Sequence, residues 1–420
     1  MLTTHNTSPR TLSRRAGYAL SVVLVGLGLF ASGVPSALYG SYQQLWGFSP
    51  LVLTLIYATY AFGVLTTLLL AGRLSDEVGR RSVLLGALTA LMVATVFFIF
   101  ADSIAWLFVA RALQGLATGA ALSAASAALF EFHPTRDPRG VSLANGVAST
   151  IGTGLGVFVS GAFVQLLPAP RVLPYVALLI LFTLAFAGVW RMPEYVVARS
   201  RPRLTLQRPY VPPAIRGPFM LAALAAVSSW SIGGLFLSLG PILSAQLFHT
   251  TNHLAATAGV FALTGSASVA QLVFRRAAPS AGAAFGSLAL AAGMALLVVA
   301  AATRSDVAYV AGAVIGGSGF GVAFLGGLRA LTAVIPAEHR AAVMSAFCIV
   351  AYAALSLPAI AGGVVAGSVG VLPTFEIFGS AVAAVALVVA VRAAGTRPST
   401  DRSNHHPGAY RPVLQPVEAL

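Results

Sequence analysis

The fold of this chain is decided by the stretch Gly72-Arg73-Leu74-Ser75-Asp76-Glu77-Val78-Gly79-Arg80-Arg81, which lies between two long apolar runs. Its charged side chains need water, so the stretch is predicted to be a loop outside the apolar phase. Glycine permits the tight turn that joins two antiparallel helices. Asp76 is placed to cap a helix N-terminus or to meet its positive dipole end. Three arginines in so short a loop indicate the cytoplasmic side of a membrane.

The composition outside this loop is that of a membrane protein. Of the 420 residues, 58% are hydrophobic and only 9% are charged, and the mean hydropathy is +0.87. These values exclude a soluble multidomain protein. The net charge of +14 could indicate nucleic-acid binding, but the basic residues are all arginines in short loops. We interpret them as topology signals and expect no nucleic-acid partner.

Apolar segments recur along the chain and number twelve. They lie at about 16–38, 51–71, 82–100, 104–128, 143–166, 174–191, 217–246, 254–274, 282–302, 307–328, 342–365 and 374–392. Each is near the roughly 20 residues that a helix needs to cross the hydrocarbon core, and helices satisfy their own backbone groups where water is absent. The first run follows a basic segment, as in a signal peptide, but it is too long for one and is expected to be retained. We therefore predict an all-α polytopic protein of the lipid bilayer.

The arginines predict the orientation of these helices. An even number of spans puts both termini on one side of the membrane. If the first loop is outside, most arginines fall in inner loops and tails, and only Arg171 and Arg304 lie in outer loops. Because basic residues concentrate on the cytoplasmic side, we expect a multi-pass protein of the inner (cytoplasmic) membrane with both termini cytoplasmic.

A stretch rich in proline and arginine divides the spans into two sets of six. The expected parts are a cytoplasmic tail (1–15), a six-helix half (16–191), a cytoplasmic linker (192–216), a second six-helix half (217–392) and a disordered tail (393–420). The halves also share a pattern: Gly115-x-x-x-Gly119 before Pro134 is repeated as Gly317-x-x-x-Gly321 before Pro336. Such internal duplication is typical of transporters that work by alternating access.

The opening loop spells G-x-x-x-D-x-x-G-R-R and so resembles the signature loop of the major facilitator superfamily of secondary transporters. It carries Glu77 where that family usually has a basic residue. The resemblance implies two pseudo-symmetric six-helix halves and a gating loop made of Gly72, Asp76, Gly79, Arg80 and Arg81. It also implies that Glu131 joins Asp76 and Arg80 in a charge relay that holds the halves together in the outward-open state. From the residues alone, Glu131 could equally be a solvated carboxylate at a helix end.

The fourth span carries an arginine in its interior. Arg111, Gln114 and Thr118 share one helical face. An intramembrane arginine is costly, so we expect it to face the bundle interior or a watery cavity; the alternative is a structural arginine bonded to backbone carbonyls. The spelling R-x-x-Q-G resembles a superfamily motif whose arginine faces the central cavity and is implicated in proton or substrate coupling.

The fifth span carries small residues at helical spacing, namely Gly152, Gly156, Ser160 and Gly161. Small residues let a neighbouring helix approach closely. The segment is similar to the G-x-x-x-G-P-x-x-G-G motif of drug-exporting antiporter branches, with Val157 replacing the proline and Ser160 one glycine. Helix packing alone is the alternative interpretation of this segment.

Further side chains are candidates for lining a central cavity: Tyr39, Tyr57, Asn145, Trp230, Gln271 and Tyr352. Each could instead be a core residue or an interfacial aromatic. Pro35 and Pro358 are expected to interrupt the first and eleventh spans, and Gly316–Gly319 the tenth, where a kink would serve gating.

Taken together, these features predict a secondary transporter of a small molecule, working as a monomer without cofactor or metal and exporting its substrate against protons. An uncoupled facilitator, an importer of a neutral or anionic metabolite, and a channel or receptor are the alternatives. A membrane enzyme is not expected, because the spans hold no convergent His, Asp, Glu or Cys residues. With Arg111 the one charge expected to face the middle of the cavity, a neutral or anionic substrate is favoured over a cation. Proton coupling would then borrow a carboxylate from a helix end, Glu131 first and Glu376 second.

Overall fold

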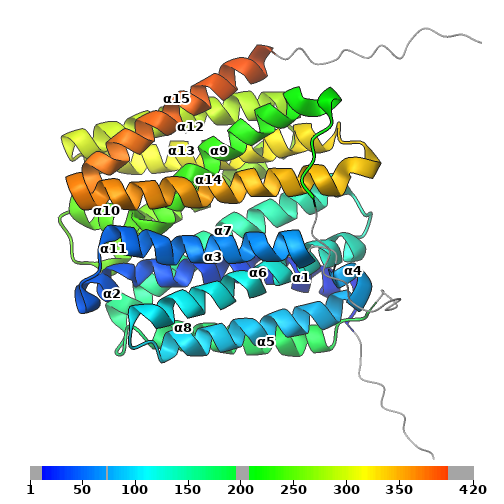
Figure 1. The fold of residues 1–420 in the computed structure, drawn as a ribbon, viewed down its shortest axis with the longest axis horizontal. Coiled ribbons are helices and arrows are strands. Elements are labelled where there is room, and N and C mark those ends of the chain that lie inside the picture. Colours follow the sequence, from blue (N-terminus) through cyan, green and yellow to red (C-terminus); the bar gives the residue numbers. More distant parts are fainter. Residues whose placement is uncertain (1–11, 72–73, 195–207, 396–420) are drawn as a thin grey trace, which may run out of the picture.

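The computed structural model describes residues 12–71, 74–194 and 208–395, and within these ranges the chain is a bundle of helices (Figure 1). Twelve helical segments are long and apolar enough to cross a membrane. The predicted all-α polytopic fold is therefore confirmed for the described part of the chain.

The first six spans are built from the following elements: α1 (Arg14–Gly33), η1 (Val34–Ala37), α2 (Tyr39–Trp46), α3 (Pro50–Ala71), α4 (Leu74–Val78), α5 (Arg80–Ile99), α6 (Ile104–Phe132), α7 (Pro138–Leu166) and α8 (Leu173–Trp190). The last six follow as η2 (Pro213–Ile215), α9 (Arg216–Ser238), α10 (Gly240–Leu247), α11 (His253–Val273), η3 (Phe274–Arg276), α12 (Pro279–Thr303), α13 (Asp306–Thr332), η4 (Ala337–His339), α14 (Arg340–Val369) and α15 (Val371–Gly395). Figure 1 places the first set below the second.

The helix bounds differ from the expected spans where proline and glycine occur. The first span breaks into α1, η1 and α2 around Pro35, as predicted. The tenth span is one unbroken helix, α13, so the interruption predicted at Gly316–Gly319 is wrong. Pro358 lies inside the continuous helix α14, so the interruption predicted there is wrong as well. Most of the predicted linker and all but the first residues of the predicted tail lie outside the described residues, so the division into parts stays a prediction.

We call one end of the bundle the arginine-rich side. It comprises residues 74–81, 133–137, 191–194, 208–216, 274–278 and 333–340, and α4 lies there in Figure 1. The other end comprises residues 47–49, 101–103, 167–172, 248–252 and 304–305.

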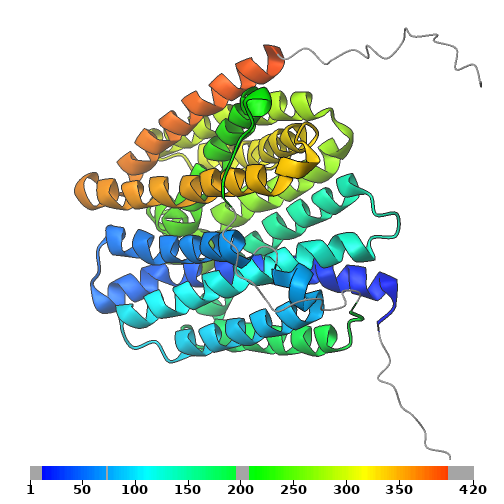
Figure 2. The same cartoon turned by 45° about the vertical axis from the view of Figure 1, so that its right-hand side comes forward.

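The two sets of helices meet along two seams, α7 with α11 and α3 with α14. In both views α14, in orange, runs beside α3, in blue (Figure 1 and Figure 2). In the seam between α7 and α11, glycines of α7 face polar side chains of α11: Gly146 faces Gln271, Gly154 faces Thr264 and Gly161 faces Thr257. Small residues on α7 therefore set the close approach of the two helices.

The small residues of the fifth span also pack α7 against α1. A Cβ at Gly152 would collide with the carbonyl oxygen of Gly26, and a Cβ at Gly156 with that of Phe30. Ser160 stands where the similar motif has a glycine, and its hydroxyl donates to the carbonyl oxygen of Val34 at 2.9 Å. The geometry is that of close helix packing, and a role in transport direction stays a prediction.

This packing predicts the effect of one added methyl group. We expect Gly152→Ala to lower the free energy of unfolding by about 1–3 kcal/mol, because the two backbones must move apart. Gly86→Ala is the matched control, since no atom lies within 4 Å of a Cβ there. Thermal unfolding midpoints of the purified variants measure the difference. Equal midpoints for the two variants would contradict the assigned contact.

Candidate functional site

Helix α6 carries Arg111 into the interior of the first six spans. The side chains of Arg111, Gln114 and Thr118 are buried, and Arg111 is 0% exposed. The guanidinium of Arg111 donates to the hydroxyl of Tyr39 through Nε at 2.9 Å and Nη2 at 2.5 Å. Its Nη1 donates to Gln114 Oε1 at 2.8 Å and to the carbonyl oxygen of Ser32 at 3.1 Å. Within the described ranges, no carboxylate lies within 4.0 Å of this charge.

The break in the first span leaves a backbone carbonyl near Arg111 without its helical donor. Pro35 has no N–H, so the carbonyl of Ala31 lacks its usual helical partner, and Gln114 Nε2 donates to it at 2.9 Å. The 3₁₀ turn of η1 shifts the backbone bonding pattern. Arg111 and Ser160 then donate to the carbonyls of two further residues of this break. Arg111 therefore makes a backbone contact of the kind expected for a structural arginine.

Aromatic side chains surround this arginine. The rings of Tyr39 and Tyr60 each lie 5.4 Å from the guanidinium carbon of Arg111. Tyr57 is 2% exposed and belongs to the same hydrophobic core as Tyr39. Arg111 thus sits among aromatic rings and hydroxyl groups.

The second set of helices brings its own aromatic cluster to the seam between α3 and α14. Trp230 of α9 packs edge-on against Tyr352 of α14 with ring centres 5.1 Å apart, and lies 5.4 Å from the ring of Phe324. Tyr352 clusters in turn with Tyr60 of α3. Four predicted lining residues, Tyr39, Tyr57, Trp230 and Tyr352, are therefore gathered around one region between the halves.

Asn145 and Gln271 lie elsewhere. Asn145 accepts a hydrogen bond from Ser126 at 3.3 Å, and Gln271 faces Gly146 across the seam between α7 and α11. Both lie near the arginine-rich end of their helices, whereas Arg111 lies near the opposite end of α6. The predicted lining set is thus divided between two levels of the bundle.

The structure brings together the residues of the expected charge relay. Arg80 pairs with Asp76 at 2.5 Å and with Glu131 at 3.1 Å, and it donates to the hydroxyl of Ser75 at 2.6 Å. These contacts join α4, α5 and α6, all in the first set of helices. Gly72 of the predicted gating loop lies outside the described residues. A gating role for this cluster stays a prediction.

Glu194 is a further functional candidate that was not predicted from the sequence. The backbone N–H groups of Arg80 and Arg81 donate to its carboxylate at 3.2 Å and 2.8 Å. Glu194 therefore satisfies the N-terminus of α5, while Asp76 lies in the first turn of α4 and pairs with Arg80. Gly79 takes a φ of +105°, and a Cβ there would lie 2.6 Å from Glu194 Oε2. The available signal was an acidic residue directly after the sixth span.

These features define the class of protein. In the described part of the chain, twelve helices long and apolar enough to cross a membrane form two sets that meet along two seams, with a buried arginine beside one of them. This is the architecture of an alternating-access transporter. Residues 18–359 match the family model of the Major Facilitator Superfamily. The chain belongs to this superfamily and is a multi-pass membrane transporter, not an enzyme.

Curated relatives match part of the chain. A gallate transporter of Pseudomonas putida is 29% identical over 196 residues, covering 44% of this chain and 42% of that protein. A gentisate transporter of Corynebacterium glutamicum is 31% identical over 127 residues, covering 29% and 28%. The 4-hydroxybenzoate transporter PcaK of Pseudomonas aeruginosa is 28% identical over 187 residues, covering 43% and 42%. The chain thus aligns with less than half the length of each.

A solved structure with the same fold is that of the human organic anion transporter MFSD10 (TETRAN). It superposes with a TM-score of 0.64 at 16% sequence identity, and the match covers 91% of this chain and 100% of that one. At this identity the match supports the fold.

The cap on α5 predicts a test of the gating loop. We expect Glu194→Ala to weaken the N-terminus of α5 by about 0.5–2 kcal/mol and to lower the initial transport rate severalfold without lowering the amount of protein in the membrane. Glu194→Gln should fall between, since it keeps a hydrogen-bond acceptor and loses the charge. The control is Glu338→Ala, an exposed carboxylate in η4 on the same side. Unchanged transport in Glu194→Ala would exclude a role for the cap in the transport cycle.

Proposed function

We propose that this transporter carries a small organic anion of the aromatic carboxylate class by alternating access between its two halves. The observation that carries the proposal is the buried guanidinium of Arg111, which has hydroxyl, amide and carbonyl partners and no described carboxylate within 4.0 Å. A charge in a poorly screened interior favours a ligand of opposite sign and repels a cation.

The aromatic cluster supports the second part of the proposal. An anion bound at Arg111 lies beside Tyr60, and Tyr60 is in contact with the cluster of Tyr352 and Trp230. A flat ring attached to the carboxylate therefore has aromatic faces and edges to pack against in the other half. A ligand that contacts both halves is suited to couple its binding to their relative motion.

The relatives support the same class of substrate. The compounds in the names of the three curated relatives, gallate, gentisate and 4-hydroxybenzoate, are all aromatic carboxylic acids. Because this chain aligns with less than half of each relative, the substrate class remains our proposal for it.

We further propose that the arginine-rich side faces the cytoplasm, in the inner membrane, and that the chain works as a monomer. The excess of arginine at this end supports the orientation. The groups that bind the Arg111 guanidinium all come from this chain, as a working monomer requires. Export and proton coupling stay predictions from the sequence.

Substitution of Arg111 tests the proposed substrate class. In proteoliposomes we expect saturable uptake of labelled 4-hydroxybenzoate, gallate or gentisate. Arg111→Ala should raise the KM about 30-fold or more, because a buried charged partner is lost, whereas Arg111→Lys should retain partial function if positive charge suffices. Full activity of Arg111→Ala, or saturable transport of a quaternary ammonium compound in place of the acids, would overturn the proposal.

Proton coupling is tested with an imposed pH gradient. We expect the gradient to stimulate uptake in the wild type, and we expect Glu131→Gln to abolish this stimulation, because Glu131 is the first candidate for the proton carrier. The control for intact protein is the exchange of labelled external acid for unlabelled acid inside preloaded vesicles, measured without a pH gradient. Stimulation that persists in Glu131→Gln would exclude Glu131 as the carrier, and a wild type insensitive to pH would indicate an uncoupled facilitator.

A further inference from the structure

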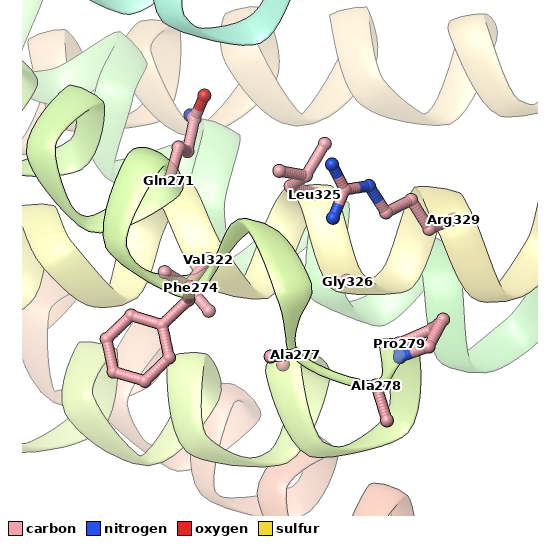
Figure 3. Close-up of a pocket in the computed structure, with 10 residues that line it drawn as sticks. Gln271, Phe274, Ala277, Ala278, Pro279, Val322, Leu325, Gly326 and Arg329 are labelled. Atoms are coloured by element: carbon pink, nitrogen blue, oxygen red, sulfur yellow. The ribbon is translucent and has the colours of Figure 1, made fainter. Parts of the chain in front are cut away.

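A small pocket with two polar side chains in its wall lies far from Arg111, at the arginine-rich end of the second set of helices. It is formed where α11 ends in η3, where α12 begins, and along the last turns of α13 (Figure 3). Most of its wall is apolar or small, with Phe274, Ala277, Gly282 and Leu325 among the lining residues. The two polar side chains in the wall are those of Gln271 and Arg329.

Arg329 brings an incompletely paired guanidinium to this pocket. Its Nη1 donates to the carbonyl oxygen of Arg275 at 3.2 Å. Its Nε is buried and has no hydrogen-bond partner, and no carboxylate of the described residues lies within 4.0 Å. Figure 3 shows the guanidinium directed back along α13, beside Leu325. A buried donor without an acceptor is costly, which points to a ligand that supplies one.

The charged residues around Arg329 do not supply that acceptor. Arg139 and Asp137, at the start of α7, are near enough to act on its charge. However, the carboxylate of Asp137 accepts the backbone N–H groups of Arg139 and Gly140 at 3.0 Å and 3.1 Å. The bond from the N–H of Arg139 lowers the pKa of Asp137 and keeps it ionised in this capping role. Arg139 adds a further positive charge near the pocket.

Gln271 is the second incompletely paired group. Its side chain is 2% exposed, and its Oε1 has no hydrogen-bond partner. The amide lies against Gly146 of α7, so the pocket reaches the seam between the two halves. A 180° rotation of the side-chain amide exchanges its oxygen and its NH₂ group. The side chain can therefore hydrogen-bond either an anion or a hydroxyl group.

We infer that Arg329 and Gln271 form an anion site that receives the carboxylate of the substrate at the arginine-rich side. This inference rests on the proposed function. The pocket volume of about 10 Å³ admits an atom the size of a carboxylate oxygen and excludes the ring. The ring therefore stays outside the pocket.

The site lies at a different depth from Arg111. Arg111 is about 10 Å along α6 from the end opposite the arginine-rich side, whereas Arg329 is about 35 Å along α13 from that same end, at about 1.5 Å per residue. The two arginines are thus separated by about 25 Å along the helices, and they belong to different halves. The transport path accordingly has two binding sites for the substrate carboxylate. We call the site at Arg329 and Gln271 the second station.

Binding to the purified full-length chain tests this second station. Labelled 4-hydroxybenzoate is measured by equilibrium dialysis in the wild type, in Arg111→Ala, and in Arg111→Ala combined with Arg329→Gln or with Gln271→Leu. We expect Arg111→Ala to retain residual binding, and both added substitutions to weaken it about tenfold or more. Arg111→Ala with Arg276→Gln is the matched control, because Arg276 is exposed and does not line the pocket. Elution as a single species and an unchanged unfolding midpoint exclude misfolding.

The outcomes separate this inference from the proposed function. No residual binding in Arg111→Ala, or residual binding indifferent to Arg329→Gln, would overturn the second station and leave the Arg111 site intact. Binding that survives Arg111→Ala unchanged and is lost in Arg329→Gln would support the second station and overturn the role of Arg111. Equal competition for the residual binding by chloride or inorganic phosphate would show a general anion site and overturn its assignment to the substrate carboxylate.

Discussion

The structure depends on how the bundle satisfies a broken helix in its interior. Pro35 cannot donate to the carbonyl of Ala31, and a membrane offers no water to replace the missing bond. Gln114 supplies that donor, and Arg111 and Ser160 bind the carbonyls of two further residues of the break. One proline therefore requires polar side chains from α6 and α7, and it explains why a buried guanidinium can be held there without a carboxylate partner.

The need to satisfy the broken span also affects how closely α7 can pack against α1. Ser160 replaces a glycine of the similar motif, and it still lets α7 approach α1 because a hydroxyl is small. Gly156 and Gly152 allow the same approach one and two turns earlier along α7. Packing and hydrogen bonding are thus supplied by neighbouring positions of a single helix. The donors hold the break of the first span in place from two sides.

Much of this arrangement could be predicted from sequence, because the signals were local. Hydropathy located the twelve spans, and the resemblance of the loop to the superfamily signature implied that Asp76, Arg80 and Glu131 come together. Glu194 was missed because it reaches the N-terminus of α5 from 113 and 114 residues away in sequence. The glycines of the tenth span were interpreted as a kink, since sequence does not reveal that α11 and α12 press against Gly317 and Gly319. Asn145 and Gln271 were grouped with Arg111 because they are polar residues within spans. They lie at a different level of the bundle, which depends on how the helices pack.

The seam between α7 and α11 has a consequence for the energetics of opening. Two of its hydroxyl groups are bonded within their own helix: Thr257 donates to the backbone carbonyl of His253, and Thr264 to that of Val260. When the helices separate at such places, no donor or acceptor loses its partner, and the cost is mainly that of lost dispersion contacts. Direct bonds across the seam are confined to a few points, such as Thr150 with Ser268 at 2.7 Å and His253 with Gln165 at 2.9 Å. Open and closed arrangements of this seam therefore differ little in hydrogen bonding, and the modest free energy of binding one small ligand is enough to shift the balance between them.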